Sequence, residues 1–408
     1  MYSTEEKIQF LADLIAIDSV NGKEKEVAIY IQSFLKQHGI DSEVIDLGDN
    51  RADLIASYGS GKPVIGISGH MDVVAAGDEA AWDFNPFELT DHEGKLYGRG
   101  TADMKGGVAA LIFALLEIKD QDLLEKGSIR LMLTAAEESV QTGSAHLHEN
   151  KYMDDVDALI IAEPTGSVIN TANKGSMNFT IHSAGHAAHS SIPNVGKNAI
   201  TPLLQFVLRI EEEMSKAIED VEFSSFDFSD VIVNFGGVEG DEVGNKALNK
   251  FLRSTFLTNS MFSGGVQINS VPDTASASFN VRTVNEFDNN KVKELFHKVL
   301  AEFEDANFTL EMSLDLAPAI TTGENDFVEL AHKLGEEIIG IPFKVGPTTG
   351  VTDASNLLLS KDPDFKFIVM GPGQTSLAHQ VNEHIDKDIY FNYIDLYVQL
   401  ISQYANKA

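Results

Sequence analysis

The chain alternates amphipathic helical segments with short, β-branched apolar runs as far as about residue 175. The helical segments include "GKEKEVAIYIQSFLKQHGI" and "GGVAALIFALLEIKD", and the strand-like runs include "PVIGISGH", "SIRLMLTAAEE" and "ALIIAEPT". This alternation predicts an α/β fold in which helices cover a mostly parallel mixed sheet. In such folds, ligands bind beyond the carboxyl ends of the strands.

The pattern changes between residues 177 and 288, where strands such as "GSMNFTIHSAG" and "TASASFNVRT" surround two helical stretches. This is typical of an α+β domain with an antiparallel sheet. Helix and strand alternation resumes with "NKVKELFHKVLAEFED". We therefore predict a discontinuous first domain, residues 1–176 and 289–408, with a second domain inserted at 177–288. The length of 408 residues agrees with two domains, because a chain of this length is longer than one hydrophobic core usually accommodates.

Composition excludes several classes of function. The 62 acidic residues outnumber the 30 basic ones, and the resulting charge of −32 repels nucleic acid and anionic membrane surfaces. The absence of cysteine excludes disulfides, thiolate catalysis and sulfur-ligated metals, so any metal must be held by oxygen and imidazole. We expect a cytoplasmic protein, because the sequence has no basic leader and no run of 18 apolar residues.

Two polar residues stand at the end of the apolar run that closes with "GHMDVV". The strand period of two points His70 and Asp72 in the same direction, at a strand end where a site would lie. His70 could be a metal ligand whose imidazole Asp72 orients through the other ring nitrogen or tunes from a distance. A capped strand end is the alternative interpretation.

Asp103 lies in the glycine-flanked turn "YGRGTADMKGG" before a predicted helix. One interpretation makes Asp103 the N-cap of that helix, a position that aspartate favours. The other makes it a ligand in a crowded centre, where the flanking glycines let the backbone approach closely.

Three further segments repeat the pattern of an acidic or imidazole group beyond an apolar run. Glu137 and Glu138 follow "IRLML", Glu163 follows "ALIIA", and His379 lies in a glycine-rich loop after "FKFIVM". Two adjacent carboxylates repel each other unless a cation offsets them, although a solvated surface turn would also accommodate Glu137 and Glu138.

Together these residues form a set of oxygen and nitrogen ligands that suits two metal ions. If Asp103 bridges, each metal receives one histidine, one glutamate and one shared oxygen, which leaves positions open for water. Glu137 then remains free to act as a general base. The predicted ligands are His70, Asp103, Glu138, Glu163 and His379.

The remaining histidines need a separate interpretation. Six of them have polar neighbours and are interpreted as surface residues: His38, His92, His146, His148, His297 and His332. The cluster "HSAGHAAHSS" holds His182, His186 and His189, with no carboxylate beside it in sequence. A proton-transfer or oxyanion role is therefore favoured over metal binding there.

The sequence resembles the dinuclear zinc metallopeptidase family that includes succinyl-diaminopimelate desuccinylase, acetylornithine deacetylase, aminoacylase and the glutamate carboxypeptidases. The matching segments run along nearly the whole chain: "GHMDVV", "WDFNPFELTDHEGKLYGRGTADMKGG", "TAAEES", "AEPT", "GHAAHSSIPNVGKNAI", "INSVPD" and "MGPGQTSLAHQVNEHI".

The resemblance implies a role for each residue of the centre. His70 and Glu163 would hold one Zn²⁺, Glu138 and His379 the other, and Asp103 would bridge them; Co²⁺ could replace zinc. Glu137 would be the general base, Asp72 would support His70, and a cis peptide bond would follow Asp103.

The resemblance also implies that the inserted domain is a lid through which a homodimer forms. His189 would reach the active site of the partner subunit and stabilise the oxyanion, while Arg282 and Asn269 would bind the substrate carboxylate.

A small N-acyl amino acid is the expected substrate. Deacylases and glutamate carboxypeptidases resemble this sequence in having glutamate at Glu163, whereas dipeptidase and tripeptidase branches usually have aspartate there. We expect amide hydrolysis of N-succinyl-diaminopimelate first, and of N-acetylornithine or another acylated amino acid next. A dipeptidase or carboxypeptidase on the same centre and a catalytically silent binding protein are the remaining alternatives.

Overall fold

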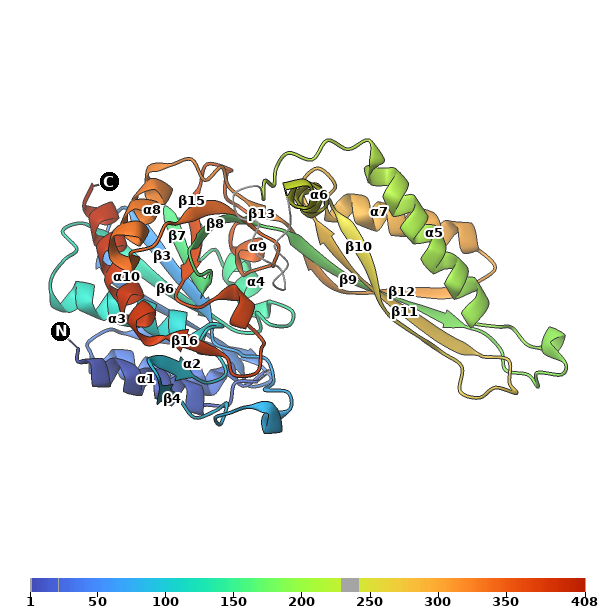
Figure 1. Ribbon diagram of the computed structural model, residues 1–408, viewed down its shortest axis with the longest axis horizontal. Helices are drawn as coiled ribbons and strands as arrows, with labels where there is room; N and C mark the ends of the chain where they lie inside the picture. Colours follow the sequence, from blue (N-terminus) through green and yellow to red (C-terminus); the bar gives the residue numbers. More distant parts are fainter. Residues whose placement is uncertain (1, 21, 229–241, 408) are drawn as a thin grey trace. The chain divides into compact units, whose positions relative to one another are not determined.

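The computed structural model describes residues 2–20, 22–228 and 242–407, which form two compact units (Figure 1). Unit 1 consists of Met1–Thr171, Thr321–Gly346 and Thr352–Ala408, and unit 2 of Ala172–Ile320 and Pro347–Val351. The predicted fold class is confirmed, since unit 1 has a mixed, centrally parallel sheet and unit 2 an antiparallel sheet.

The first pass of the chain through unit 1 contributes four helices and most of its strands. Their bounds are α1 (Thr4–Ala16), α2 (Glu24–Gln37), β1 (Ser42–Gly48), β2 (Arg51–Ser60), β3 (Val64–His70), β4 (Thr90–His92), β5 (Lys95–Tyr97), α3 (Lys105–Asp120), β6 (Gly127–Thr134), α4 (Thr142–Glu149), β7 (Ala158–Pro164) and β8 (Val168–Asn173). The second pass adds α8 (Asp326–Ile339), β14 (Lys344–Thr348), α9 (Ala354–Leu357), β15 (Lys366–Gly371), β16 (His384–Asp386) and α10 (Lys387–Lys407).

The main sheet of unit 1 runs in the order β1-β2-β6-β3-β7-β15-β8. Its four middle strands, β6, β3, β7 and β15, pair in parallel, while the outer pairs are antiparallel. All seven residues of β3 are buried, as expected for a central parallel strand covered on both faces. The carboxyl ends of the four middle strands therefore meet at one edge of the sheet.

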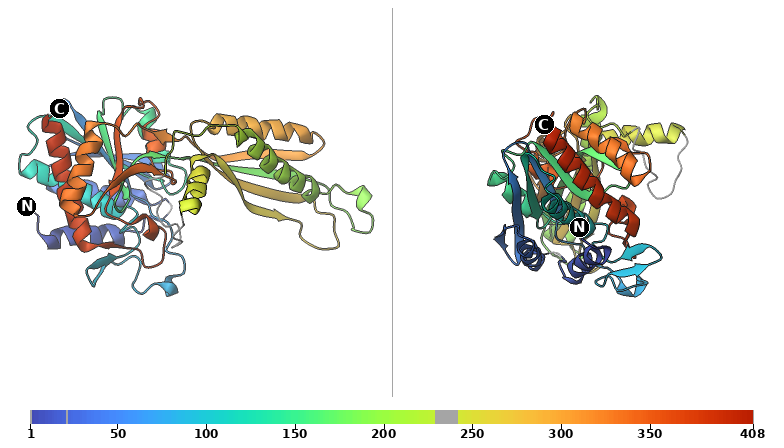
Figure 2. Two further views of the ribbon diagram at one scale, coloured as in Figure 1. Left: turned by 45° about the horizontal axis from the view of Figure 1, so that its top comes forward. Right: turned by 90° about the vertical axis from the view of Figure 1, so that its left-hand side faces the viewer.

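Helices α3, α8 and α10 pack together, with α10 contacting both of the others. Both views of Figure 2 show α8 and α10 side by side. Nearly every residue of α3 is buried, as its largely apolar sequence predicts. Gly107 lets this helix approach the sheet, because a Cβ there would lie 2.1 Å from the carbonyl oxygen of Ala162 in β7. Ser3 and Glu6 form a capping box at the start of α1.

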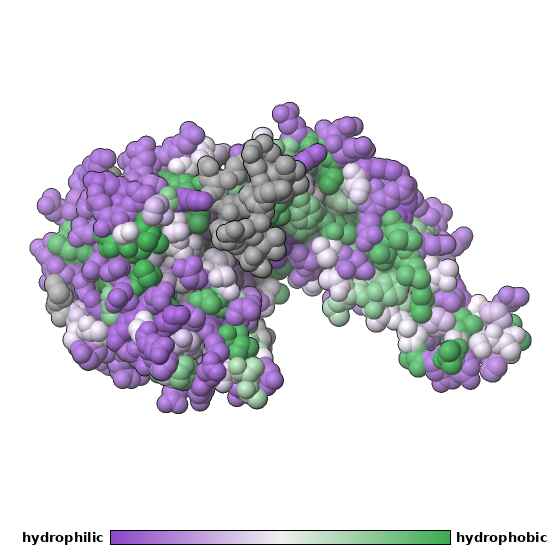
Figure 3. Space-filling model, viewed as in Figure 1, coloured by the Kyte–Doolittle hydropathy of each residue, from purple (hydrophilic) through white to green (hydrophobic). Residues whose placement is uncertain are grey.

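The visible surface of unit 1 is largely hydrophilic. Hydrophilic side chains cover much of its visible face in Figure 3. Among the described residues, we find no helix that combines the length and the apolar character needed to cross a bilayer.

Unit 2 is a four-stranded antiparallel sheet covered by helices. Its order is β10-β11-β9-β12, so β9 is paired on both edges. The elements are β9 (Gly175–Ala184), α5 (Ile200–Glu219), α6 (Glu242–Arg253), β10 (Phe256–Gly264), β11 (Thr274–Thr283), α7 (Asn289–Leu300), β12 (Asn307–Leu316) and β13 (Ala319–Ile320).

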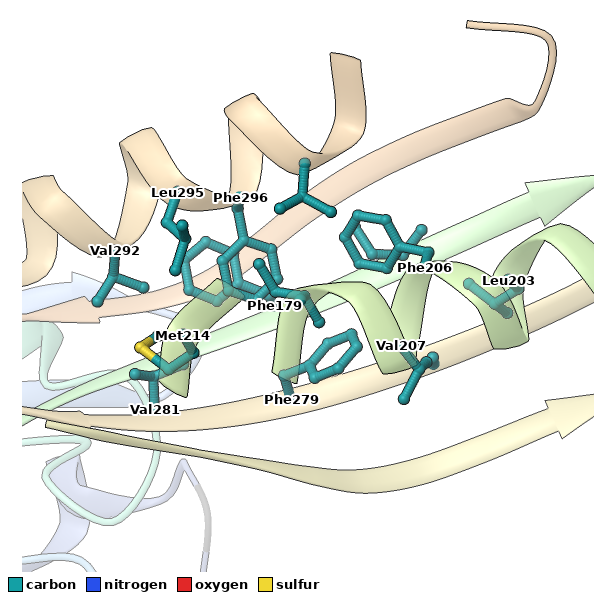
Figure 4. Packing of buried hydrophobic residues seen from close by; sticks show 14 of the residues in the cluster. Phe179, Leu203, Phe206, Val207, Met214, Phe279, Val281, Val292, Leu295 and Phe296 are labelled. Atoms are coloured by element: carbon teal, nitrogen blue, oxygen red, sulfur yellow. The ribbon is translucent and has the colours of Figure 1, made fainter. Parts of the chain in front are cut away.

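The core of unit 2 lies between this sheet and helices α5 and α7 (Figure 4). Alternate residues of β9 and β11 point into it, as the strand period requires. Phe179 of β9 stacks on Phe296 of α7, with ring centroids 4.1 Å apart. Phe206 of α5 contacts Phe296 at a centroid distance of 6.3 Å. Phe206 also contacts Phe279 of β11 at a centroid distance of 6.2 Å, so aromatic contacts hold both helices to the sheet.

The inserted unit extends further along the chain than the predicted 177–288. It begins at Ala172 and continues to Ile320, because α7 supplies Phe296 to its core and β12 pairs with β9. The helical pattern of "NKVKELFHKVLAEFED" shows that one face of this helix is apolar, but it does not show which sheet that face covers.

Candidate metal centre

The five predicted ligands converge at the carboxyl edge of the parallel strands of unit 1. His70 ends β3, Glu163 is the next-to-last residue of β7, and Glu138 follows β6. His379 lies in the loop after β15, and Asp103 in the turn before α3. Because β6, β3, β7 and β15 are neighbours in the sheet, residues far apart in sequence meet here.

Asp103 stands between the two histidines. Its Oδ1 lies 3.1 Å from Nε2 of His70, and its Oδ2 lies 3.4 Å from Nε2 of His379. Each histidine also faces one glutamate: Nε2 of His70 is 3.7 Å from Glu163, and Nε2 of His379 is 2.9 Å from Glu138. The side chains thus form two sets that share the Asp103 carboxylate.

Among the residues that the structure describes, two groups of ligand atoms are compact enough to hold a metal ion. One comprises His70, Asp103 and Glu138, and the other His70, Glu137 and Glu163; within each group the ligand atoms lie within 4.8 Å of one another. Glu137 is therefore close to the centre as well, which suits either a base or an additional ligand.

The backbone fixes the tautomer of His70. Its Nδ1 lies 2.9 Å from the main-chain carbonyl oxygen of Asp72, which can only accept, so Nδ1 carries the hydrogen. In the neutral ring Nε2 is then free to bind a metal. The Asp72 carboxylate is 3.7 Å from the same nitrogen and instead accepts the backbone N–H groups of Glu137 and Glu138, at 3.1 and 3.0 Å.

The turn that carries Asp103 is not a helix cap. The N-cap of α3 is Met104, and no side chain caps the helix, so the alternative interpretation of Asp103 is wrong. The peptide bond between Asp103 and Met104 is cis, as the resemblance implied.

Glu383, which the sequence analysis did not single out, holds this turn. Its buried Oε1 accepts the backbone N–H groups of Gly100, Ala102 and Asp103 at 3.0, 2.8 and 2.9 Å, and its Oε2 pairs with Arg99. Glu383 follows His379 by four residues and so ties two ligand segments together. The only sign of this role in the local sequence is that Glu383 is the acidic residue of "QVNEHI", close to His379.

A second missed residue orients Glu137. The side-chain amide of Gln141 donates to Oε1 of Glu137 at 2.8 Å, and Asn356 of α9 lies 3.3 Å from the Gln141 amide oxygen. Gln141 is buried and has a φ of 53°. No local sequence pattern connects Asn356 to this loop, because the contact depends on the tertiary fold.

The electrostatics of the centre favour cations. Burial, reinforced by the Glu163 carboxylate, raises the pKa of Glu137 well above its usual value, and burial raises the pKa of Glu163 to about 8. Hydrogen bonds to Asp103 and Glu138 raise the pKa of His379 to about 10. Burial and mutual repulsion thus favour the protonated forms of Glu137 and Glu163, whereas, despite burial, the two histidines lower the pKa of Asp103, and a bound cation would relieve the repulsion among the carboxylates.

The donor set fits divalent metal ions that accept nitrogen and oxygen. Imidazole and carboxylate are ligands of zinc and of related first-row metals. The crowding of carboxylates around Asp103, and the hydrogen on His70 Nδ1 that leaves Nε2 available, both agree with a metal centre.

The predicted residues of the inserted domain lie in unit 2. His189 and Asn269 occupy neighbouring loops, since Ser190 N–H donates to the Asn269 carbonyl at 3.0 Å and His189 bridges to Ser270. Arg282 lies in β11, eight residues after its first residue, Thr274. At about 3.3 Å per residue, this places Arg282 roughly 25 Å along the sheet from the Asn269 end.

His182 has a carboxylate partner that the local sequence does not reveal. Its Nε2 lies 3.0 Å from the Glu311 carboxylate of β12, the strand that pairs with β9. Both side chains are about half exposed. This ion pair belongs to the sheet surface of unit 2.

The chain is similar to known metallopeptidases in sequence. Residues 66–403 match the model of peptidase family M20/M25/M40. The chain is 40% identical over 405 residues to a probable succinyl-diaminopimelate desuccinylase of Staphylococcus epidermidis, covering 99% of both chains. It is 38% identical over 410 residues to the protein of that name in Staphylococcus aureus, covering 100% of this chain and 99% of the relative.

Solved structures share the fold at lower sequence identity. The M20 family metallo-carboxypeptidase Sso-CP2 of Sulfolobus solfataricus has a TM-score of 0.86 at 20% identity, covering 98% of this chain and 99% of that one. The di-peptidase Dug1p of Saccharomyces cerevisiae has a TM-score of 0.75 at 18% identity, covering 98% and 96%. At these identities the likeness concerns the fold alone.

Proposed function

The chain belongs to peptidase family M20/M25/M40 and is a metal-dependent hydrolase, and from this premise we propose that it hydrolyses the amide bond of N-succinyl-LL-2,6-diaminopimelate. The products would be succinate and diaminopimelate, as in lysine biosynthesis. One observation carries the substrate proposal: the chain is 40% identical, over 99% of both lengths, to a relative named as a desuccinylase.

We assign two cations to the centre, with zinc the expected metal and cobalt a substitute. His70 and Glu163 would hold one, His379 and Glu138 the other, and Asp103 would supply one oxygen to each. When bound, such cations supply Lewis-acid activation of the attacking water and of the scissile carbonyl.

Glu137 is the proposed general base. Its carboxylate lies beside His70 and Glu163 and is oriented by Gln141. Neither of the two proposed ligand sets includes Glu137, so its carboxylate remains available to accept a proton. Its raised pKa suits a group that takes a proton from water and then gives it to the leaving amine. Asp72 supports this role because its carboxylate holds the Glu137 N–H.

His189 is the proposed donor to the oxyanion. Its Nδ1 lies 3.2 Å from the backbone N–H of Ser191 and accepts from it, so in the neutral ring Nε2 carries the hydrogen and can donate. A donor of this kind, aimed at the developing oxyanion, typically contributes about 3 kcal/mol to transition-state stabilisation.

Arg282 and Asn269 are the proposed partners of the substrate carboxylates. Asn269 lies before the start of β11 and Arg282 near its end, roughly 25 Å apart along the strand. The two side chains of a single protomer therefore cannot both bind one small molecule. A homodimer formed through unit 2 resolves this, because each protomer could supply one of the two residues. Leu204 and Leu208 on α5 are 47% and 68% exposed, which supports an apolar contact between copies.

The decisive experiment is a substrate panel. The purified protein, loaded with zinc or cobalt, is assayed on N-succinyl-diaminopimelate, N-acetylornithine, other N-acyl amino acids and free dipeptides. We expect the highest kcat/KM for the succinyl substrate. Higher kcat/KM for another acyl group or for a dipeptide would overturn the substrate assignment, and no metal-dependent hydrolysis of any of them would favour a binding protein.

The shared site can be tested separately. His189→Ala should slow hydrolysis while leaving the metal content unchanged. Mixing this variant with a Glu137 variant should restore part of the rate if the sites are completed by the partner subunit.

A further inference from the structure

Four consecutive backbone N–H groups after β6 each donate to a buried carboxylate. This segment carries both Glu137 and Glu138. The three carboxylates come from separate places, the start of α2, the strand β2 and the segment after β3, and each is at most 1% exposed. The pairs are Ala135 with Asp53 at 3.0 Å, Ala136 with Glu24 at 3.3 Å, Glu137 with Asp72 at 3.1 Å, and Glu138 with Asp72 at 3.0 Å.

The segment needs such support because its backbone is strained. Ala136 has a φ of 65°, in the left-handed region that non-glycine residues rarely adopt. Such a conformation persists only where the surroundings over-determine it. The N–H of Ala136 is held by Glu24, and its carbonyl oxygen accepts the N–H of Gln141 at 2.6 Å.

The Asp53 carboxylate and the backbone of Ala135 pack closely against Gly143. A Cβ at Gly143 would lie 2.4 Å from Asp53 Oδ1 and 2.5 Å from the Ala135 nitrogen, so only glycine leaves room for this hydrogen bond. The other oxygen, Oδ2, lies 3.3 Å from Nδ1 of His146 on α4. Glu24 is fixed in turn by Arg51, whose Nη1 is 2.9 Å from Oε1.

The buried carboxyl groups of Asp53 and Glu24 lie away from the side chains of the proposed ligands and need an explanation, because burying a polar or charged group opposes folding unless hydrogen bonds compensate. Here the compensation is directed at one segment. Moving that segment would displace the Glu137 and Glu138 side chains together, since both extend from it.

We propose that Asp53 and Glu24 are positioning residues that, with Asp72, clamp the backbone of residues 135–138 and so place Glu137 and Glu138 for catalysis. Neither residue touches the reacting atoms. Their effect on rate rests on the proposed function of Glu137, whereas their effect on the backbone does not.

The backbone effect is tested first, by hydrogen–deuterium exchange on protein stripped of metal by chelation. In Asp53→Ala, peptides spanning 131–140 should exchange at least tenfold faster, because the Ala135 N–H loses its acceptor. Asp53→Asn keeps an oxygen in the same place and should restore protection. The matched control is Glu117→Ala, which removes a buried carboxylate of α3 that pairs with Lys7 at 2.6 Å and lies outside the segment.

The catalytic effect is tested on metal-loaded enzyme with the best substrate of the panel. Asp53→Ala and Glu24→Ala should lower kcat by about 10- to 100-fold, the usual effect of groups that orient catalytic residues, with KM changed less than about twofold. Asp53→Asn should recover kcat to within about threefold of the parent enzyme.

The outcomes separate the two proposals. Unchanged exchange of 131–140 in a folded Asp53→Ala protein overturns the clamp, as does equal acceleration in Glu117→Ala. An Asp53→Asn variant as slow as Asp53→Ala also overturns it. If the parent hydrolyses no substrate of the panel, the proposed function fails while the exchange experiment still decides the clamp.

Discussion

The two units bury very different side chains at their centres. In unit 1, the carboxyl edge of the parallel strands gathers Asp72, Asp103 and their acidic neighbours around two histidines. In unit 2, the space between sheet and helices is filled by phenylalanine and aliphatic side chains, with Phe179 stacked on Phe296 (Figure 4).

This difference separates stability from chemistry. Buried apolar side chains stabilise a fold in proportion to the area they remove from water, whereas buried like charges oppose folding. Unit 1 tolerates its acidic centre because a largely apolar and buried helix, α3, and the fully buried strand β3 lie beside it. Substitutions in the two centres should therefore have opposite signatures.

The largest effect should follow from Glu137→Ala. We expect kcat to fall by about 10²- to 10⁴-fold, the usual contribution of a general base. Metal content should persist, and stability should not decrease because one member of a repelling set is gone. Measured kcat, metal analysis and thermal unfolding test this, with exposed Glu149→Ala as control. Retained activity would remove Glu137 as the base.

Phe296→Ala should show the opposite pattern. Removing this fully buried ring should cost about 3–5 kcal/mol, the usual range for a core phenylalanine. Metal binding by unit 1 should not change. Exchange protection of β9 and β11 peptides reports unit 2 alone, and Phe262→Ala, at a 39% exposed position of β10, is the control. If the variant lost metal while the β9 peptides kept their protection from exchange, the assignment of metal binding to unit 1 and of this stability change to unit 2 would be contradicted.

A smaller effect concerns the pH dependence of stability. Burial, together with Asp353 and Glu24 nearby, raises the pKa of Asp53 from 3.8 to about 8, although the Ala135 N–H opposes the shift. Between these values the folded state holds a proton that the unfolded chain has released, so stability falls as pH rises, by about 1.4 kcal/mol per unit at most.

Asp53→Asn removes this titration and should flatten the pH dependence of the free energy of unfolding between pH 6 and pH 7. Denaturant titrations of the parent and the variant at both values measure it. A parent slope equal to that of the variant would show that Asp53 is ionised throughout this range.

Most of the proposed ligands could be selected from the sequence for a physical reason. His70, Glu138, Glu163 and His379 each end or follow an apolar run, and in a parallel sheet such positions share one edge, whereas Asp103 lies in a glycine-flanked turn before a helix. The clamp could not be predicted in this way, because Glu24 stands in an ordinary helix start and its contact with Ala136 depends on the tertiary fold. An acid inside the apolar run "ADLIA" was the only local sign of Asp53.

The extent of unit 2 was mispredicted for a related reason. An amphipathic helix such as α7 carries no mark of the sheet that it covers, and β12 is assigned only by its pairing with β9. The pairing of His182 with Glu311 likewise joins residues 129 positions apart.

The unequal exposure of the two histidines has a consequence for how the centre is assembled. The side chain of His70 is 1% exposed and that of His379 is 51% exposed. Under the proposed assignment, an ion at the His379 side can enter, leave or exchange ligands with the surrounding medium while the fold stays intact. An ion at the His70 side would be held by a buried imidazole and would therefore exchange more slowly with the surrounding medium.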